Sequence, residues 1–220
     1  MRLFLVRHGE SRSNADWNQV TKPADLNSPL TEKGFQQVEK LAGWMKANLE
    51  NIDAVYSSSL IRAEQTAQPI ADAFHVSLLI DHRLREGGYN FTDGSPIPDD
   101  QLPLHKSVDF HLHPSEPFDP SVENCETYVQ LKNRVGYFLD EMLQRYLGKT
   151  IVVSTHGWTS NAFFDVIFGS CSMRQCYFQV ENTALSFFQY KPDQKLGPWF
   201  AQFIAQTPHL PFYPEGIHFE

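Results

Sequence analysis

Two short apolar segments, each followed by a turn that contains His-Gly, constrain the fold of this chain most strongly. Residues 3–6 lead into Arg7 and His8, and residues 150–154 lead into His156. Apolar runs of this length, without polar alternation, are typical of buried parallel strands. Because open α/β sheets bind ligands at the carboxyl ends of their strands, we expect both histidines to open into one crevice.

Helical and strand patterns alternate along the rest of the chain. Thr31 is predicted to cap a helix whose apolar positions run from Phe35 to Leu49. The other expected helices are 60–74, 126–147 and 159–168, and the other expected strands are 53–57, 76–80, 184–190 and 199–205. This alternation predicts an α/β fold, a three-layer α/β/α sandwich with a largely parallel sheet.

Length and composition bound the class of protein. The 220 residues suffice for one sizeable core, and we interpret 1–220 as a single domain. The net charge of −8 argues against a nucleic-acid binder, although a local basic pocket remains compatible with it. We expect neither a targeting segment nor a membrane span. Three cysteines without zinc-binding or CxxC spacing indicate reduced thiols in a cytoplasmic protein. The sequence predicts no oligomeric state.

Residues 87–124 differ from their surroundings, because they hold six prolines and show little periodicity. We interpret this segment as a lid insertion over the site rather than a linker between domains. Within it, His111 and His113 have a spacing that could hold a metal, but an isolated pair in a Pro-rich loop favours coincidence. We therefore expect no metal and no cofactor. The tail, 207–220, is expected to pack on the surface.

The residue types at the strand ends indicate a phosphate site. Guanidinium groups match the geometry of phosphate, and an imidazole can accept a phosphoryl group as a nucleophile. Arg62 lies in the first turn of a predicted helix, where the helix N-terminus also favours an anion. The alternatives are structural: Arg62 could be a solvated residue paired with Glu64 or Asp72, and His8 could simply bond to backbone.

Several motifs together resemble the histidine phosphatase (phosphoglycerate mutase-like) superfamily, and they occur in family order from residue 2 to about 190. They are Arg7-His8-Gly9 with Asn14; 29–34, similar to PLTxxG; 58–67, similar to SPLxRAxQTA with Ser59 in place of proline; 84–86, Leu-Arg-Glu; 154–157, similar to SHG with Thr155 inserted; and 182–186, similar to the last core strand. The resemblance implies a phosphoglycerate mutase-like fold and a phosphate-transferring active site.

The resemblance also implies roles for four residues. His8 would attack phosphorus as a neutral imidazole and form a phosphohistidine. Arg7 and Arg62 would clamp the phosphoryl oxygens. His156 would donate a hydrogen bond to the same group, as an imidazolium. One ring nitrogen of His8 must be held by a hydrogen bond, whose partner the sequence does not identify.

Glu86 is implied as the general acid that protonates the leaving oxygen. The residues after it depart from the family pattern ExxxGxWEG, with Asn, Thr and Asp at positions 90, 92 and 93 where Gly, Trp and Glu are usual. A loop glutamate without catalytic duty therefore remains an alternative. Asn14 and Ser58 are candidate secondary phosphate contacts, and each could equally be a cap or turn residue.

Together these observations predict a metal-independent phosphomonoesterase of the histidine acid phosphatase type, acting on a small phosphorylated substrate. One alternative is phosphoryl transfer of the phosphoglycerate mutase type, in which a second hydroxyl replaces water. Another is a protein that binds phosphorylated ligands without catalysis. The substrate itself is expected to be selected by the segment 87–124.

Overall fold

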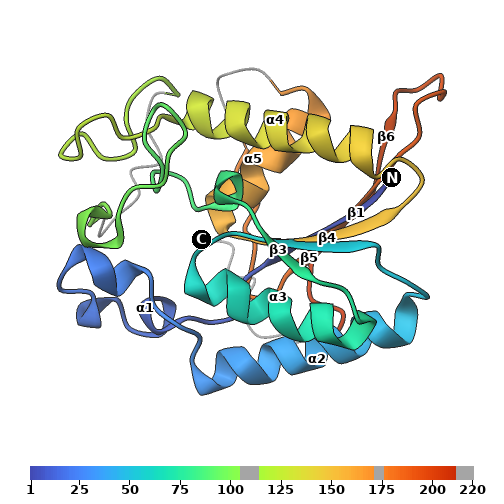
Figure 1. Ribbon diagram of the computed structural model, residues 1–220, viewed down its shortest axis with the longest axis horizontal. Helices are drawn as coiled ribbons and strands as arrows, with labels where there is room; N and C mark the ends of the chain where they lie inside the picture. The colour runs from blue at the N-terminus through green and yellow to red at the C-terminus, as the bar shows by residue number, and fades with distance from the viewer. Residues whose placement is uncertain (105–113, 171–175, 212–220) are drawn as a thin grey trace.

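Figure 1 shows the computed structural model, which describes residues 1–104, 114–170 and 176–211. Its centre is a six-stranded sheet in the order β3-β2-β4-β1-β5-β6. The strands are β1 (Arg2–Arg7), β2 (Ala54–Ser57), β3 (Leu78–Ile80), β4 (Thr150–Thr155), β5 (Leu185–Tyr190) and β6 (Trp199–Gln206). The first four strands in chain order pair in parallel, whereas β5 and β6 pair antiparallel. The largely parallel sheet that the sequence predicts is confirmed.

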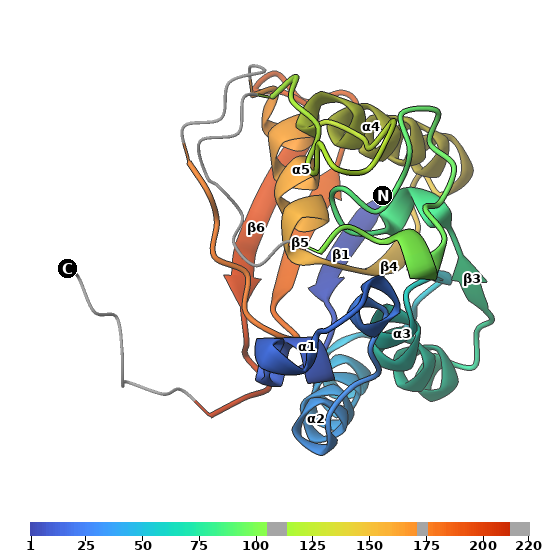
Figure 2. The same ribbon diagram turned by 90° about the vertical axis from the view of Figure 1, so that its left-hand side faces the viewer.

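Helices cover both faces of this sheet, so the three-layer prediction is also confirmed. In Figures 1 and 2, α2 and α3 lie against one face, and α4 and α5 lie against the other. The helices are α1 (Arg12–Ala15), α2 (Glu32–Asn48), α3 (Ile61–Phe74), α4 (Tyr128–Arg145) and α5 (Gly157–Phe168). Short 3-10 turns are η1 (Trp17–Gln19), η2 (Pro23–Leu26), η3 (His82–Leu84) and η4 (Asp99–Gln101).

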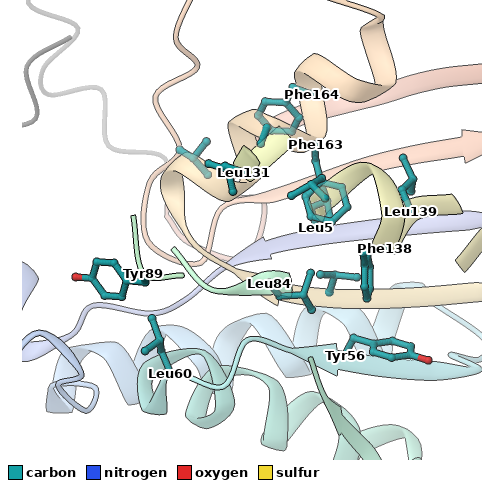
Figure 3. Close-up of a cluster of buried hydrophobic side chains, with 14 of the residues drawn as sticks. Leu5, Tyr56, Leu60, Leu84, Tyr89, Leu131, Phe138, Leu139, Phe163 and Phe164 are labelled. Atoms are coloured by element: carbon teal, nitrogen blue, oxygen red, sulfur yellow. The ribbon is translucent and has the colours of Figure 1, made fainter. Parts of the chain in front are cut away.

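The alternation of side chains along β1 explains why both faces are covered. Leu3 and Leu5 join the buried cluster under α4 and α5, and Phe4 and Val6 join the cluster under α2 and α3. Figure 3 shows the first cluster, in which Leu5 lies near side chains of α4 and α5. Burying each such side chain contributes about 1.5–3 kcal/mol. The central strands are therefore held from both sides, and their ends are fixed in place.

The helix boundaries follow their caps. The Thr31 hydroxyl accepts a hydrogen bond from the Gly34 amide at 3.0 Å, which confirms the predicted cap of α2. Phe35, expected on the apolar face of that helix, is instead 42% exposed and lies in its first turn. Helix α5 begins at Gly157, two residues before the predicted start at Thr159. This earlier start matters for the site described below.

The described parts of the segment 87–124, residues 87–104 and 114–124, are largely irregular, as the sequence predicts, and they run beside the strand ends in Figure 1. In its described part, η4 packs near η2, and Asn27 Nδ2 donates to Asp99 Oδ2 at 2.8 Å. His111 and His113 lie outside the described residues, so their spacing stays untested. Of the tail, 207–211 are described, and His209 Nε2 lies 2.9 Å from Thr183 Oγ1. The lid and tail assignments therefore remain predictions.

Candidate active site

The ends of β1 and β4 bring the two histidines together. Arg7 pairs with Thr155 in the parallel register, so the next residue of each strand, His8 and His156, stand side by side. Their ring centroids lie 5.0 Å apart, and the rings are inclined at 56°. Both side chains are buried, with 2% and 0% of their surfaces exposed. The two strand ends therefore bring both histidines together, as expected.

The His8 ring is oriented by its own turn. Nδ1 lies 2.7 Å from the Gly9 carbonyl oxygen, so this nitrogen carries the hydrogen and donates it. Nε2 therefore holds the lone pair, and it accepts a hydrogen bond from Arg62 Nε at 3.2 Å. Burial, and then the charges of Arg62 and Arg7, hold the pKa of His8 well below its usual value. The imidazole is consequently neutral, with a lone pair on the nitrogen that faces the guanidinium.

The two arginines beside His8 are held by backbone carbonyl groups rather than by carboxylates. Arg62 is buried, and its Nη1 donates to the Leu26 carbonyl oxygen at 2.8 Å, so it pairs with neither Glu64 nor Asp72. Arg7 donates to the Val180 carbonyl, and its buried Nε has no hydrogen-bond partner in the described part of the chain. Neither forms an ion pair with a described carboxylate. This pocket is therefore electropositive and suited to a dianion.

His156 is fully buried in this neighbourhood. Burial, followed by the charge of Arg62, holds the pKa of His156 well below its usual value, which favours a neutral ring over the imidazolium that the sequence led us to expect. Its Nε2 lies 2.8 Å from the Ser58 hydroxyl, which can donate to it. Its buried Nδ1 has no partner among the described residues. A neutral ring with the hydrogen on Nδ1 can still donate one hydrogen bond into the pocket.

The two candidate phosphate contacts, Ser58 and Asn14, lie in different surroundings. The Ser58 hydroxyl is engaged with His156, and it also accepts from the Leu60 amide at 3.3 Å. Asn14 is exposed at the rim, where its Oδ1 accepts from Asn182 Nδ2 at 3.2 Å. Asn182 Nδ2 also donates to the His8 carbonyl oxygen at 3.1 Å. Sequence reasoning did not single out Asn182 as a site residue, because only its strand motif was recognisable.

Glu86 lies at the N-terminus of α5. Its Oε1 accepts from three backbone amides, those of Gly87 at 2.9 Å, Trp158 at 3.0 Å and Thr159 at 3.2 Å. The amides at a helix N-terminus suit a carboxylate oxygen. Oε2 faces Gly157, where a Cβ would lie 3.8 Å from it. The two carboxylate oxygens are thus unequal: Oε1 is saturated with donors, and Oε2 is not held by these amides.

Glu86 also lies close enough to the surroundings of His8 for its charge to act on Arg62. Burial lowers the pKa of Arg62, and the neighbouring Tyr89 and Glu86 partly offset that change. Arg62 Cζ lies 5.8 Å from the centre of the Tyr89 ring, so the segment that follows Glu86 forms one wall of the pocket. The structure therefore brings Arg7, His8, Arg62, Glu86 and His156 into one neighbourhood.

The described residues contain no group of three or more His, Cys, Asp and Glu side chains arranged to hold a metal ion. Nor does any helix in the described ranges have the length and apolar character needed to cross a membrane.

Comparisons with known proteins agree with this geometry. A sequence profile described as the histidine phosphatase superfamily (branch 1) matches residues 3–198. Phosphoserine phosphatase 1 from Hydrogenobacter thermophilus is 29% identical over 187 residues, covering 84% of this chain and 85% of that protein. A probable phosphoglycerate mutase from Yersinia pestis is 26% identical over 212 residues, covering 96% and 95%. A solved phosphoserine phosphatase mutant from Entamoeba histolytica, in complex with phosphoserine, has a TM-score of 0.68 at 23% identity, covering 95% of this chain and 98% of that chain.

Proposed function

Because this chain belongs to the histidine phosphatase superfamily, we propose that it hydrolyses a small phosphate ester through a phosphohistidine formed on Nε2 of His8. The observation that carries the proposal is the state of that ring. Nδ1 is held by the Gly9 carbonyl oxygen, and burial beside two guanidinium groups keeps the imidazole neutral. A neutral imidazole with one free lone pair beside an uncompensated positive pocket is suited to attack a phosphate dianion.

In the first step, Nε2 of His8 attacks phosphorus, so that an N–P bond forms and the ester P–O bond breaks. The phosphoryl group takes the place of the present contact between Nε2 and Arg62, whose Nε then donates to a phosphoryl oxygen. Arg7 and the Nδ1–H of His156 complete the donors around the equatorial oxygens. Oε2 of Glu86 gives its proton to the leaving oxygen, and a neutral alcohol departs.

In the second step, Glu86 takes a proton from water as the water oxygen attacks phosphorus. The N–P bond breaks, and its electron pair returns to Nε2 of His8. Phosphate leaves, and both side chains regain their starting protonation states. The sum is ester plus water giving alcohol plus phosphate. We propose metal-independent turnover because the guanidinium groups of Arg7 and Arg62 supply the positive charge that this transfer requires.

The relatives suggest which esters to test first. Phosphoserine phosphatases and a phosphoglycerate mutase are similar to this chain, so small esters bearing a carboxylate come first. We place the activity in the cytoplasm, which agrees with the reduced state of Cys125 and Cys176. If a phosphoglycerate is isomerised rather than dephosphorylated, the mutase alternative holds instead. If phosphorylated ligands bind without turnover, the protein is a binder.

The test is phosphate release from an aryl phosphate and a panel of small phosphomonoesters, with a chelator present, for the wild type and His8→Ala. We expect chelator-resistant turnover by the wild type and none by His8→Ala. His75→Asn, at an exposed helix C-cap outside the site, is the matched control and should retain full activity. Turnover that survives in His8→Ala, or that disappears with the chelator, would contradict the proposal.

A further inference from the structure

We infer that Arg134 and Glu126, a buried ion pair outside the reacting groups, position Glu86 for proton transfer. The inference rests on the proposed function, since it concerns the group proposed there as the general acid. Arg134 lies on α4 and Glu126 lies in the loop before it, with side chains only 6% and 1% exposed. Neither residue stood out in the sequence, and neither contacts His8 or His156 among the described hydrogen bonds.

Arg134 binds the backbone on both sides of Glu86. We call residues 83–88 the acid-bearing turn. Nη1 of Arg134 donates to the Arg83 carbonyl oxygen, and Nη2 donates to the carbonyl oxygens of Arg85 at 2.8 Å and of Glu86 itself at 3.1 Å. One guanidinium therefore fixes three carbonyl groups of a single turn. A guanidinium can do this because its donors form a rigid, planar fork.

Glu126 completes the hold from the other side. Its carboxylate accepts from Arg134 Nε at 2.8 Å and Nη2 at 2.7 Å, so the pair is bidentate. Oε1 of Glu126, which accepts from Nη2 of Arg134, also accepts from the Gly88 amide at 2.9 Å. The pair thus holds carbonyl oxygens before and at Glu86, and an amide after it.

The acid-bearing turn needs such support because of its sequence. Gly87 and Gly88 follow the acid directly, and Gly88 has a φ of +80°. Glycine loses more conformational freedom on folding than other residues, so this backbone would otherwise sample many conformations. The Phe118 side chain packs against both glycines: a Cβ at Gly87 would lie 2.7 Å from Cζ of Phe118, and one at Gly88 would lie 2.6 Å from its Cβ. Packing and the ion pair therefore both constrain the backbone of this turn.

Glu86 is therefore held at two ends. The ion pair fixes its backbone, and the amides at the start of α5 fix Oε1 of its carboxylate. Oε2, the oxygen that would carry the transferred proton, is placed by these two constraints. A buried ion pair contributes little net stability compared with an apolar pair of similar size. Holding the acid-bearing turn gives this pair a purpose that stability alone does not.

A comparison of substrates with different leaving groups distinguishes a positioning role of Arg134 from a general structural role. An alkyl phosphate needs protonation of its leaving oxygen, whereas 2,4-dinitrophenolate departs without it. We would measure kcat/KM for both esters, because this parameter ends at the first phosphoryl transfer and excludes the shared hydrolysis of phosphohistidine. The variant is Arg134→Lys, which keeps the charge opposite Glu126 but loses the fork. Arg145→Lys makes the same change at an exposed pair on the same helix and is the control.

We expect Arg134→Lys to lower kcat/KM for the alkyl ester about 10- to 100-fold and for the dinitrophenyl ester less than about threefold. Glu126→Asp keeps the charge pair but shortens its reach to the Gly88 amide. It should likewise lower kcat/KM for the alkyl ester more than for the dinitrophenyl ester. Arg145→Lys should leave both values unchanged. Equal losses on the two esters, or no loss, would overturn the inference.

Glu86→Gln separates this inference from the proposed function. If Glu86→Gln shows the leaving-group dependence and the folded Arg134→Lys and Glu126→Asp variants do not, positioning is wrong while the acid role stands. If Glu86→Gln lowers kcat/KM for both esters equally, the acid role is wrong and the inference is wrong with it. If neither Arg134→Lys nor Glu126→Asp folds at 25 °C, the pair serves the fold rather than the acid, and the inference is overturned.

Discussion

His8 and His156 stand at the ends of two hydrogen-bonded, neighbouring strands, whereas Glu86 stands on a glycine-containing turn that side chains from elsewhere hold in place. We call the first region the strand-end half of the site; it consists of Arg7, His8, Ser58, Arg62 and His156. The strand-end half takes its geometry from regular elements, whose positions follow from sheet register and core packing. The acid-bearing turn takes its geometry from one buried ion pair and one helix N-terminus.

This difference teaches which part of the chemistry each region can vary. In the proposed mechanism, phosphoryl binding and attack depend on the strand ends, which cannot move without disturbing the sheet. Proton transfer would depend on the acid-bearing turn, which a few side chains position. Substitutions in the first region should therefore affect all substrates alike, and those in the second should affect substrates according to their leaving groups.

The largest effect should come from Arg62→Met. Removing the buried guanidinium beside His8 takes away a donor to the phosphoryl oxygens, so we expect kcat/KM to fall on the order of 1,000-fold. The loss should be the same for alkyl and dinitrophenyl phosphates, since the phosphoryl group is common to both. The measurement is kcat/KM on the two esters; a loss confined to the alkyl ester would break the division between the two regions.

A second prediction concerns stability against pH. The pKa values of His8 and His156 are depressed in the folded state, chiefly by burial, and both side chains belong to the strand-end half. The unfolded chain therefore binds protons more readily, and stability is full above the unfolded pKa of about 6.5 and falls as the pH drops below it. At pH 5.5 each histidine should cost about 1.4 kcal/mol of unfolding free energy relative to pH 7.5.

Urea unfolding at pH 7.5 and 5.5 checks this prediction in the wild type and His156→Gln. The free energy of unfolding should change between the two pH values by about 1.4 kcal/mol less in the variant, because one histidine with a depressed pKa is gone. An equal pH dependence in the two proteins would show that His156 keeps its unfolded pKa in the folded state, and a larger pH dependence in the variant would show that its folded pKa is raised, as an imidazolium at neutral pH requires.

The smallest effect should come from Ser58→Ala. Its hydroxyl can donate to Nε2 of His156, which would keep the hydrogen on Nδ1, a buried nitrogen without a described partner. Losing that contact should lower kcat/KM about tenfold, corresponding to about 1.4 kcal/mol. Ser59→Ala, at the neighbouring half-buried serine, is the control and should have no effect. A normal rate for Ser58→Ala would mean that His156 does not need this orientation.

The strand-end half was largely predictable from the sequence. Continuous apolar runs gave β1 and β4, and the polar residues that follow them marked the strand ends. The start of α5 was harder, because Gly157 and Trp158 carry no capping signal; yet this start brings the Trp158 and Thr159 amides to Glu86. Burial lowers the pKa of His156, and because burial depends on the whole fold, the sequence near the residue does not indicate this shift.

The support of the acid-bearing turn was not predictable in the same way. Arg134 reaches backbone carbonyl groups about fifty residues away in the chain, and Glu126 reaches the Gly88 amide. Contacts from a side chain to a distant backbone depend on how the loop folds, not on which side chains the loop carries. In the sequence of α4, Arg134 is one of several polar residues beside the apolar face, and nothing distinguishes it from the others.

The most direct test of the account is to trap the covalent intermediate. The enzyme would be mixed with a ³²P-labelled aryl phosphate and quenched in base, where a phosphohistidine survives, and the labelled peptide would be identified by mass spectrometry. We predict label on the peptide that contains His8, at Nε2, and none in His8→Ala. Label on another residue, or a wild type that turns over substrate with no label at any quench time and a burst-free time course, would contradict the phosphohistidine mechanism.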